Sequence, residues 1–122
     1  MDIMMQEGEF NSSEDECPLS KASLLLSSKW DLIVINNIHK NKVRFSELKE
    51  KISSRLDKPV TASSLSRILK RLEINSIVKR NVKSNSGESI EISYELTQQG
   101  KDLLPVIKQL QNWGEKYLHS NQ

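Results

Sequence analysis

Six side chains that donate hydrogen bonds lie close together between residues 61 and 72. Hydroxyl, guanidinium and ammonium groups bind phosphate oxygens and the acceptor edges of bases, so this set could bind a nucleic acid. A guanidinium can donate two parallel bonds to O6 and N7 of a guanine. A solvated helix face has the same composition, and a base contact and a phosphate contact both remain open. The side chains are Ser63, Ser64, Ser66, Arg67, Lys70 and Arg71.

An apolar stripe between these polar residues predicts the helix that carries them. Its positions follow the i, i+3, i+4 and i+7 spacing of a buried helical face and are Leu65, Ile68, Leu69 and Leu72. Thr61 stands at the N-cap, where its hydroxyl can accept a backbone N–H. The sequence therefore predicts a helix over about 61–73 with a polar outer face. We interpret it as a recognition helix that enters the DNA major groove, with Arg67 and Lys70 as the strongest candidates for contact.

The charge of the chain is distributed unevenly. The sequence has 122 residues, the length of one domain, with a net charge of +2. Residues 1–16 contain six acidic residues and no lysine or arginine, and we expect them to form an acidic mobile tail. Residues 40–83 contain thirteen lysines and arginines against four acidic residues. This basic block suggests a polyanionic partner, although a solvated lysine-rich surface is an equal alternative on charge alone.

Three helices are predicted before the recognition helix. The first begins near Cys17-Pro18, and the second is capped by Ser27 or Ser28 and carries Trp30, which we expect in the core. The third is expected to be capped by Ser46, with Leu48 and Ile52 facing inward. A polar connection over 53–60 then leads to the recognition helix. Two short helices joined by a polar turn, the second with a polar outer face, form the helix-turn-helix pattern.

A β-hairpin over about 77–96 is predicted directly after the recognition helix. Apolar and polar residues alternate strictly from Ser89 to Leu96, and the cluster over 84–87 predicts a turn. A hairpin in this position is typical of a winged helix. The candidate phosphate contacts in and near this wing are Lys42, Arg44, Lys79, Arg80 and Lys83. Arg80 has an alternative role, an ion pair within the hairpin.

The chain ends in an amphipathic segment capped by Thr97. Its apolar residues, three or four positions apart, are Leu103, Ile107, Leu110, Trp113 and Tyr117. Pro105 predicts a kink or a break because it removes a backbone donor. The apolar seam could close the core of a monomer or pair two subunits. We favour pairing because few other elements are available for the seam to cover.

In order and spacing, motifs along most of the chain resemble the HxlR-type group of winged helix-turn-helix regulators, which are relatives of the MarR type. The motifs are Cys17-Pro18, Lys29-Trp30, Arg44-Phe45-Ser46-Glu47-Leu48, Leu72-Glu73, Val78 with Arg80, Tyr94-Glu95-Leu96-Thr97 with Gly100, and Pro105-Val106 with Trp113. The resemblance implies a mainly α fold with a small β-hairpin wing, and a homodimer paired through its terminal helices. The interface residues expected on this basis are Leu19, Leu103, Ile107, Leu110, Trp113 and Tyr117. Ser76 stands where the family usually has glycine.

The resemblance also implies that some members sense oxidants or electrophiles through a cysteine near the N-terminus, where Cys17 stands. A helix start favours a thiolate, whereas the acidic residues 14–16 oppose it. A cysteine retained for packing is the alternative. Because Cys17 is the only cysteine and the acidic N-terminus is unlike a signal peptide, we expect a cytoplasmic protein without membrane spans.

No spacing in the sequence matches a metal site, a phosphate-cradling loop or a catalytic nucleophile, so we expect no cofactor, no metal and no enzyme activity. The predicted organisation is the acidic tail at 1–16 and one DNA-binding and dimerisation domain at 17–122. The predicted function is that of a sequence-specific transcriptional regulator. It would bind double-stranded DNA as a homodimer on an inverted repeat and respond to an unidentified small molecule or oxidant. The alternative is a winged-helix protein-interaction module that reads no DNA sequence.

Overall fold

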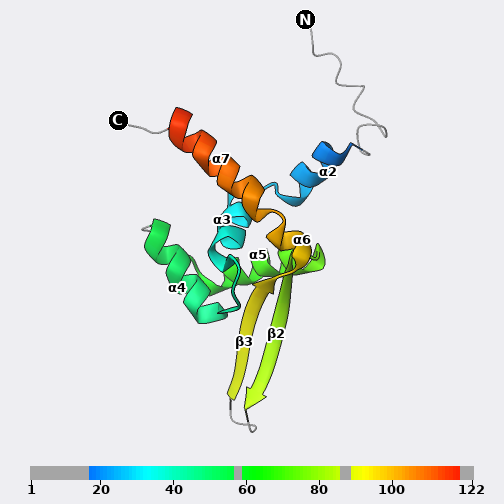
Figure 1. The fold of residues 1–122 in the computed structure, drawn as a ribbon. Helices are drawn as coiled ribbons and strands as arrows, with labels where there is room; N and C mark the ends of the chain where they lie inside the picture. The colour runs from blue at the N-terminus through cyan, green and yellow to red at the C-terminus, as the bar shows by residue number, and fades with distance from the viewer. Residues whose placement is uncertain (1–16, 57–58, 86–88, 119–122) are drawn as a thin grey trace, which may run out of the picture.

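The computed structural model describes residues 17–56, 59–85 and 89–118, and the predicted acidic tail at 1–16 lies outside them. The described part is mainly helical with one three-stranded antiparallel sheet, in the order β1-β3-β2 (Figure 1). The elements are α2 (Pro18–Leu25), α3 (Lys29–Ile38), β1 (Val43–Arg44), α4 (Phe45–Leu56), α5 (Ala62–Ile74), β2 (Val78–Asn85), β3 (Ser89–Leu96), α6 (Gln98–Lys101) and α7 (Leu104–Tyr117). The predicted winged helix-turn-helix fold is confirmed.

The helices α3 and α5 begin at the capping residues that the sequence indicates. The Ser28 hydroxyl accepts the backbone N–H of Trp30, and the carboxylate of Asp31 accepts the N–H of Ser28, which completes a capping box. The Thr61 hydroxyl accepts the backbone N–H of Ser64 at 3.1 Å. The side chains of Ser28, Asp31 and Thr61 therefore fix where these two helices start.

The helix α4 differs from its prediction at both ends. It begins at Phe45, so Ser46 lies inside the first turn and is not the cap. The N–H of Arg44 is instead bonded to the carboxylate of Glu47 at 3.2 Å, the reverse half of a capping box. The helix also continues to Leu56, so the first four residues of the expected polar connection over 53–60 are helical.

One hydrophobic core joins α3, α4, α5, the sheet and the start of α7. All four apolar positions of the recognition helix are buried in it, as are Leu48 and Ile52 of α4. Trp30 packs against this core and is half-buried. Because each helix contributes an inward stripe at helical spacing, the polar face of α5 is held on the surface.

The hairpin extends beyond the core (Figure 1). Its strands pair in register from Val78 opposite Leu96 to Asn85 opposite Ser89. The first two residues of the turn predicted over 84–87 therefore belong to β2, and its other two lie outside the described part. Tyr94 and Leu96 are buried, but Val82 and Ile90 towards the tip are exposed. The alternation that predicts one buried face therefore holds only for the base of the hairpin, since no described helix covers the outer half.

The exit from α5 requires left-handed backbone at Ser76, which has φ of 63°. The N–H of Ile77 bonds to the carbonyl of Leu72 at 2.9 Å, which closes the helix end in the way a glycine at this position usually does. The Thr97 hydroxyl donates to the carbonyl of Ser76 at 2.6 Å. A Cβ at Gly100 would come within 2.3 Å of the Ile77 carbonyl oxygen, so only glycine allows the next helix to approach this exit.

The C-terminal segment is broken into two helices, as Pro105 predicts. Thr97 caps the short α6, where its hydroxyl accepts the N–H of Gly100. Pro105 then lies in the first turn of α7, where its missing N–H leaves no helical bond unmade. The break turns α7 so that its first turns contact α3 and its remainder projects away from the core (Figure 1).

Candidate nucleic-acid interface

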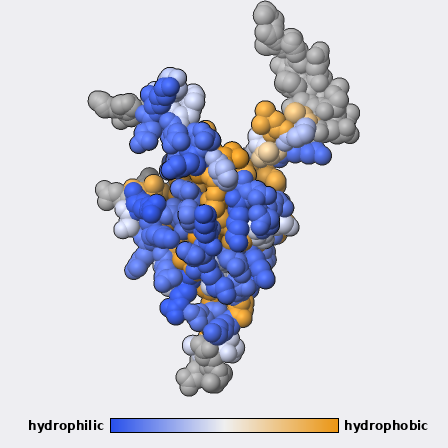
Figure 2. Space-filling view, in the orientation of Figure 1, coloured by the Kyte–Doolittle hydropathy of each residue, from blue (hydrophilic) through white to orange (hydrophobic). Residues whose placement is uncertain are grey.

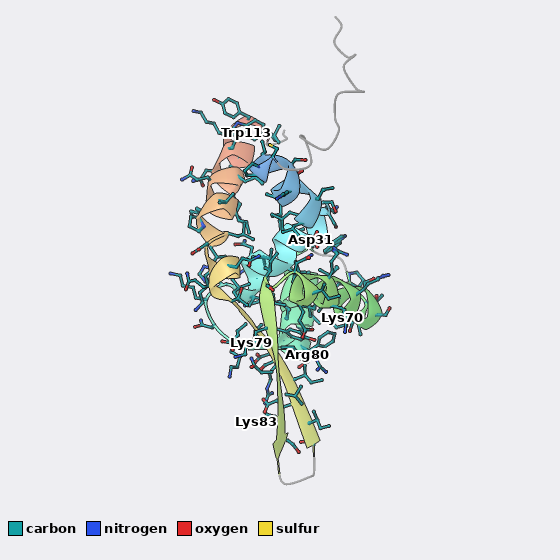
Figure 3. All side chains as sticks on the ribbon, turned by 90° about the vertical axis from the view of Figure 1, so that its right-hand side faces the viewer. Asp31, Lys70, Lys79, Arg80, Lys83 and Trp113 are labelled. Carbon is teal, nitrogen blue, oxygen red and sulfur yellow. The ribbon has the colours of Figure 1, made fainter. Side chains whose placement is uncertain are left out.

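The outer face of α5 and one face of the hairpin share a surface hollow of about 720 Å³. Its lining residues are Ser63, Ser66, Arg67, Lys70 and Glu73 of α5, Arg80 of β2 and Tyr94 of β3. Five of the residues predicted to contact DNA are therefore adjacent, although they come from two elements. Figure 3 shows Arg80 on the same side of the hairpin as α5, below Lys70.

Ser64 lies apart from this surface. Its side chain is half-buried and lines a different hollow, between the starts of α3 and α5. Helical periodicity explains the difference, because Ser64 is one residue before the buried Leu65 and four before the buried Ile68. Ser63 and Ser66 are exposed and remain the hydroxyl groups that face outward.

The cations of the hairpin are divided between its two faces. Lys79 and Lys83 alternate with Arg80 along β2 and point to the opposite side (Figure 3). Lys79 lies opposite Glu95 and Lys83 opposite Glu91 in the strand register. Arg80 lies opposite Tyr94, so it is the cation of β2 that borders the α5 surface.

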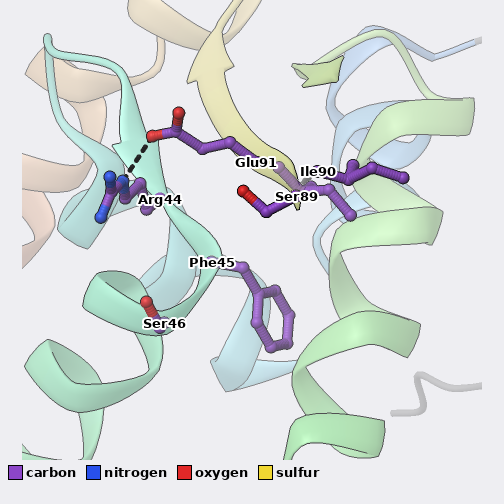
Figure 4. Close-up of a pocket in the computed structure, with 7 residues that line it drawn as sticks. Arg44, Phe45, Ser46, Ser89, Ile90 and Glu91 are labelled. Atoms are coloured by element: carbon purple, nitrogen blue, oxygen red, sulfur yellow. Dashed lines mark hydrogen bonds and ion pairs between the residues drawn. The ribbon is translucent and has the colours of Figure 1, made fainter. Parts of the chain in front are cut away.

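Arg44 forms an ion pair within the protein. Its Nε lies 2.6 Å from the carboxylate of Glu91, so the ion pair joins the neighbouring strands β1 and β3 (Figure 4). A hollow of about 420 Å³ adjoins this pair, bordered also by Phe45 and Ile90. A contact between Arg44 and phosphate would therefore have to compete with a carboxylate that already occupies its guanidinium.

None of the other predicted cations has such a partner among the residues that the structure describes. In residues 17–56, 59–85 and 89–118 the ion pairs are Arg44–Glu91 and Arg71–Asp31. No described carboxylate pairs with Arg80, so its alternative role as a structural ion pair finds no partner in this part of the chain. Cations without a described carboxylate partner keep their donors available to an anion, and those that border α5 raise the potential of its surface. The cations without such a partner are Lys42, Arg67, Lys70, Lys79, Arg80 and Lys83.

Arg71 turns inward, which the sequence reasoning missed. Its guanidinium pairs with Asp31, whose side chain is fully buried, and this ion pair joins α5 to the start of α3. The same carboxylate closes the capping box of α3. A signal was present, because Asp31 follows Trp30 and precedes an apolar run, and an acid in that setting needs a partner. The pair fixes where α5 lies relative to α3.

The apolar seam of the last helix divides into a buried and an exposed part. Ile107 is buried and Leu103 is half-buried, so both pack against the core of one subunit. In contrast, Leu110, Trp113 and Tyr117 are 52–61% exposed, and the Trp113 and Tyr117 rings lie 5.5 Å apart. No residue of α2 is buried, and Leu19 is 77% exposed. Figure 2 shows the apolar surface of α2 at the upper right, at the same end of the molecule as α7.

Cys17 is exposed at the N-cap of α2 and its side chain makes no capping hydrogen bond. Because the thiol is exposed, it is not packed inside the described part of one subunit.

Comparison with known proteins identifies the family. The model of the HxlR-like helix-turn-helix family matches residues 25–122, which is most of the chain. The chain belongs to this family. Among curated proteins, it is 30% identical over 109 residues to YvaP of Bacillus subtilis strain 168, an uncharacterized HTH-type transcriptional regulator, and the match covers 88% of this chain and 94% of YvaP.

Solved structures of similar proteins have the same fold. A MarR-family transcriptional regulator of Porphyromonas gingivalis W83 matches with a TM-score of 0.73 and 27% identity, over 84% of this chain and 94% of that one. The redox regulator HypR in its reduced form matches with a TM-score of 0.70 and 28% identity, over 82% of this chain and 92% of that one. This HxlR-like protein is therefore a DNA-binding transcriptional regulator and not an enzyme. None of its described helices is long and apolar enough to cross a membrane.

Proposed function

We propose that this HxlR-like regulator acts in the cytoplasm as a homodimer that reads an inverted-repeat operator. Each subunit inserts α5 into the major groove of one half-site, and the hairpin contacts the adjacent backbone. Membership of the regulator family supports the class of function, and the exposed surface of α5 supports the choice of DNA-contacting residues. Ser63 and Ser66 are the close-approach groups, while Arg67 and Lys70 reach to base edges or phosphates.

The observation that carries this proposal is the shared surface of α5 and β2. It brings together three cations without a described carboxylate partner, from two elements that the core and the Arg71–Asp31 pair hold in place. They are Arg67, Lys70 and Arg80. A rigid scaffold that presents unpaired donors on an exposed helix favours binding to the groove of a duplex over a random solvated face.

The cations of the proposed wing differ in where they would contact DNA. Arg80 adjoins the surface of α5, so we assign it a phosphate next to the groove that α5 occupies. Lys79 and Lys83 lie on the other face, and Lys83 is closer to the tip, where the hairpin extends past the core. We assign these two lysines to backbone phosphates, where they supply affinity and salt dependence but no sequence information. Arg44 is the weakest of the predicted contacts because it is paired with Glu91.

The exposed apolar residues at the ends of the chain support the homodimer. Leu110, Trp113 and Tyr117 continue the seam of α7 beyond the part that one subunit covers, and Leu19 is exposed on α2. A second copy would bury both stripes. A dimer also lets two short half-sites, about 10 base pairs apart from centre to centre, give useful affinity.

Binding to duplex DNA at two salt concentrations tests the proposal, with the wild type and the Arg67→Ala variant. We expect affinity to fall by about 10³–10⁵ between 50 and 200 mM salt if six to ten phosphates are contacted. We expect Arg67→Ala to reduce discrimination among duplexes by about 1–3 kcal/mol. Arg55→Ala, on an exposed position of α4 outside this surface, is the matched control. Folded protein without measurable duplex binding at low salt would favour the protein-interaction alternative.

For the effector, we propose that an oxidant acts through Cys17. The thiol is exposed, and HypR, a redox regulator, has a similar fold and sequence. With one cysteine per chain, oxidation joins the Cys17 thiols of two subunits, or one of them and a small thiol, through a disulfide. Diamide treatment should release DNA from the wild type but not from Cys17→Ser. Release from both variants, or from neither, would contradict a role for this thiol.

A further inference from the structure

One face of the sheet, turned away from α5, carries both cations and carboxylates within the described strands. Ser93 of β3 lies opposite Arg44 of β1 and opposite Asn81 of β2. Directly opposite residues of an antiparallel sheet point to the same face, and so do residues two positions apart along a strand. The register therefore brings three cations and two carboxylates together. They are Arg44, Lys79, Lys83, Glu91 and Glu95.

The two carboxylates on this face have different partners. Glu95 accepts a hydrogen bond from the side-chain amide of Asn81 at 3.0 Å, and this donor is neutral. Glu91 instead pairs with the guanidinium of Arg44, as Figure 4 shows. Neither Lys79 nor Lys83 has a carboxylate within ion-pair distance among the described residues. Glu91 therefore neutralises one of the three cations on this face.

The Arg44–Glu91 pair lies at the surface, on a backbone that is held independently of it. Arg44 is in β1, which pairs with β3, and its backbone N–H bonds to the carboxylate of Glu47 at 3.2 Å. The side chains of Arg44 and Glu91 are 55% and 31% exposed. Exposed ion pairs contribute little to folding stability, because water and salt screen them. The main effect of this pair is therefore on what else the guanidinium can bind.

A DNA phosphate is a direct competitor of Glu91 for this guanidinium. Phosphate and carboxylate groups both accept parallel N–H bonds from the fork of an arginine. Arg44 shares its face with Lys79 and Lys83, to which we assign backbone phosphates. A phosphate at Arg44 has to displace the carboxylate, and the displaced Glu91 then leaves a negative charge beside the DNA backbone.

We propose that Glu91 limits the affinity of this regulator for duplex DNA of any sequence, by holding Arg44 in an ion pair that a backbone phosphate must displace. Glu91 is a positioning residue, since it acts through Arg44 and not on DNA. The limit is the same for every sequence, because phosphates carry no sequence information and the proposed base contacts belong to α5. The inference rests on the proposed function, since it requires this face of the hairpin to lie near DNA.

The first test compares duplex affinity and its salt dependence in the wild type and in Glu91→Gln, which keeps the shape and removes the charge. Glu91→Gln should bind every duplex about two- to fivefold more tightly, the range set by the loss of an exposed ion pair. The slope of log affinity against log salt should steepen by about 1, as one more phosphate contact requires. Glu95→Gln, matched in charge and in face, should have the smaller effect and leave the slope unchanged, because it releases no arginine.

A second comparison assigns the gain to Arg44. In the Arg44→Ala background, Glu91→Gln should recover little of its gain, because no guanidinium is left to release. The exchange itself is followed by the Nε–H signal of Arg44 in ¹⁵N-labelled protein, identified by its absence from Arg44→Ala. This signal should move in Glu91→Gln, and it should move in the wild type when duplex DNA is added.

The outcomes separate this inference from the proposed function. An unchanged affinity in Glu91→Gln, while the wild type binds duplexes, overturns the inference and leaves the proposed function intact. A gain that is equal in Glu95→Gln, or that persists in Arg44→Ala, also overturns it, because net charge alone would then explain the gain. An Arg44 signal that bound DNA leaves unmoved contradicts the exchange. No duplex binding by either the wild type or Glu91→Gln at low salt contradicts the proposed function, and the inference with it.

Discussion

The helices α5 and α7 have similar lengths, 13 and 14 residues, and similar amphipathic sequences, but they use their apolar faces differently. In α5 every residue of the stripe is buried within the subunit, and the Arg71–Asp31 pair adds a polar attachment. In α7 only Ile107 is buried, and Leu110, Trp113 and Tyr117 are exposed. The first helix is complete in one subunit, and the second has an apolar surface that one subunit does not cover.

This difference fits the two binding tasks that we propose for the protein, DNA reading by α5 and subunit pairing by α7. A helix that reads DNA has to be rigid before DNA arrives, because ordering it at the moment of binding would cost affinity. A helix that pairs subunits gains its packing from the second copy. We therefore expect changes in the stripe of α5 to lower the free energy of unfolding, and changes in the exposed part of α7 to alter assembly.

Truncation of matched leucines gives the largest expected effect. Leu69→Ala, at a fully buried position of α5, should lower the free energy of unfolding by about 2–5 kcal/mol. Leu110→Ala, half-exposed on α7, should weaken dimerisation and change the unfolding of the separated subunit by well under that amount. Urea denaturation at two protein concentrations, with sedimentation of each variant, measures both quantities. An equal loss of unfolding free energy in both variants would contradict the proposed difference between α5 and α7.

The polar attachment of α5 should have the next largest effect. Arg71→Met leaves the buried carboxylate of Asp31 without its partner, at a cost of about 3 kcal/mol, the lower end for a broken buried pair because Arg71 is 41% exposed. Asp31→Asn combined with Arg71→Met should cost less than the sum of the single changes. Urea denaturation of the four proteins gives the coupling. Strict additivity would show that the pair does not act as a unit.

A smaller effect is expected on the hairpin. Lys83→Ala should weaken duplex binding by a similar factor for every sequence and reduce the slope of log affinity against log salt by about 1. Lys101→Ala on α6 is the control, since this exposed lysine is not among the residues that line the α5 surface. An altered sequence preference in Lys83→Ala would instead place that lysine at a base.

The smallest predicted effect concerns the exit of α5. Ser76→Gly should raise the free energy of unfolding by about 1 kcal/mol or less, because relief of left-handed backbone strain is partly offset by the entropy of glycine. Ser76→Val should lower it, since a β-branched residue tolerates positive φ poorly. Thermal unfolding of the two variants measures the difference. A loss of stability in Ser76→Gly would mean that the serine side chain itself matters.

The sequence predicted the parts of the fold that depend on local pattern. The cap at Thr61, the buried stripe of α5, the hairpin after it and the break near Pro105 are each set by residues within a few positions. The cap of α4 was predicted two residues too late, at Ser46, because serine is a good cap by type. The pairing of β1 with β3 fixes the chain up to Arg44, and the helix begins at Phe45. A strand pairing some fifty residues away leaves no local signal.

The candidate site was predicted less completely, for the same reason. Periodicity brings Arg67 and Lys70 to the outer face, but it also brings Arg71 near its edge, and only the buried Asp31 on another helix turns that side chain inward. The partner of Arg44, Glu91, is likewise on a distant strand. Which cations remain unpaired is a property of the packed fold, so composition alone overstates the number that face DNA.

Selection of duplexes from a random library by the purified protein tests the central claim most directly. A dimer that presents α5 to two half-sites should enrich an inverted repeat, with half-site centres about 10 base pairs apart. Arg67→Ala should broaden the enriched sequence at one position in each half-site, and Lys83→Ala should leave it unchanged. No enriched sequence, or a single half-site without a repeat, would contradict the account.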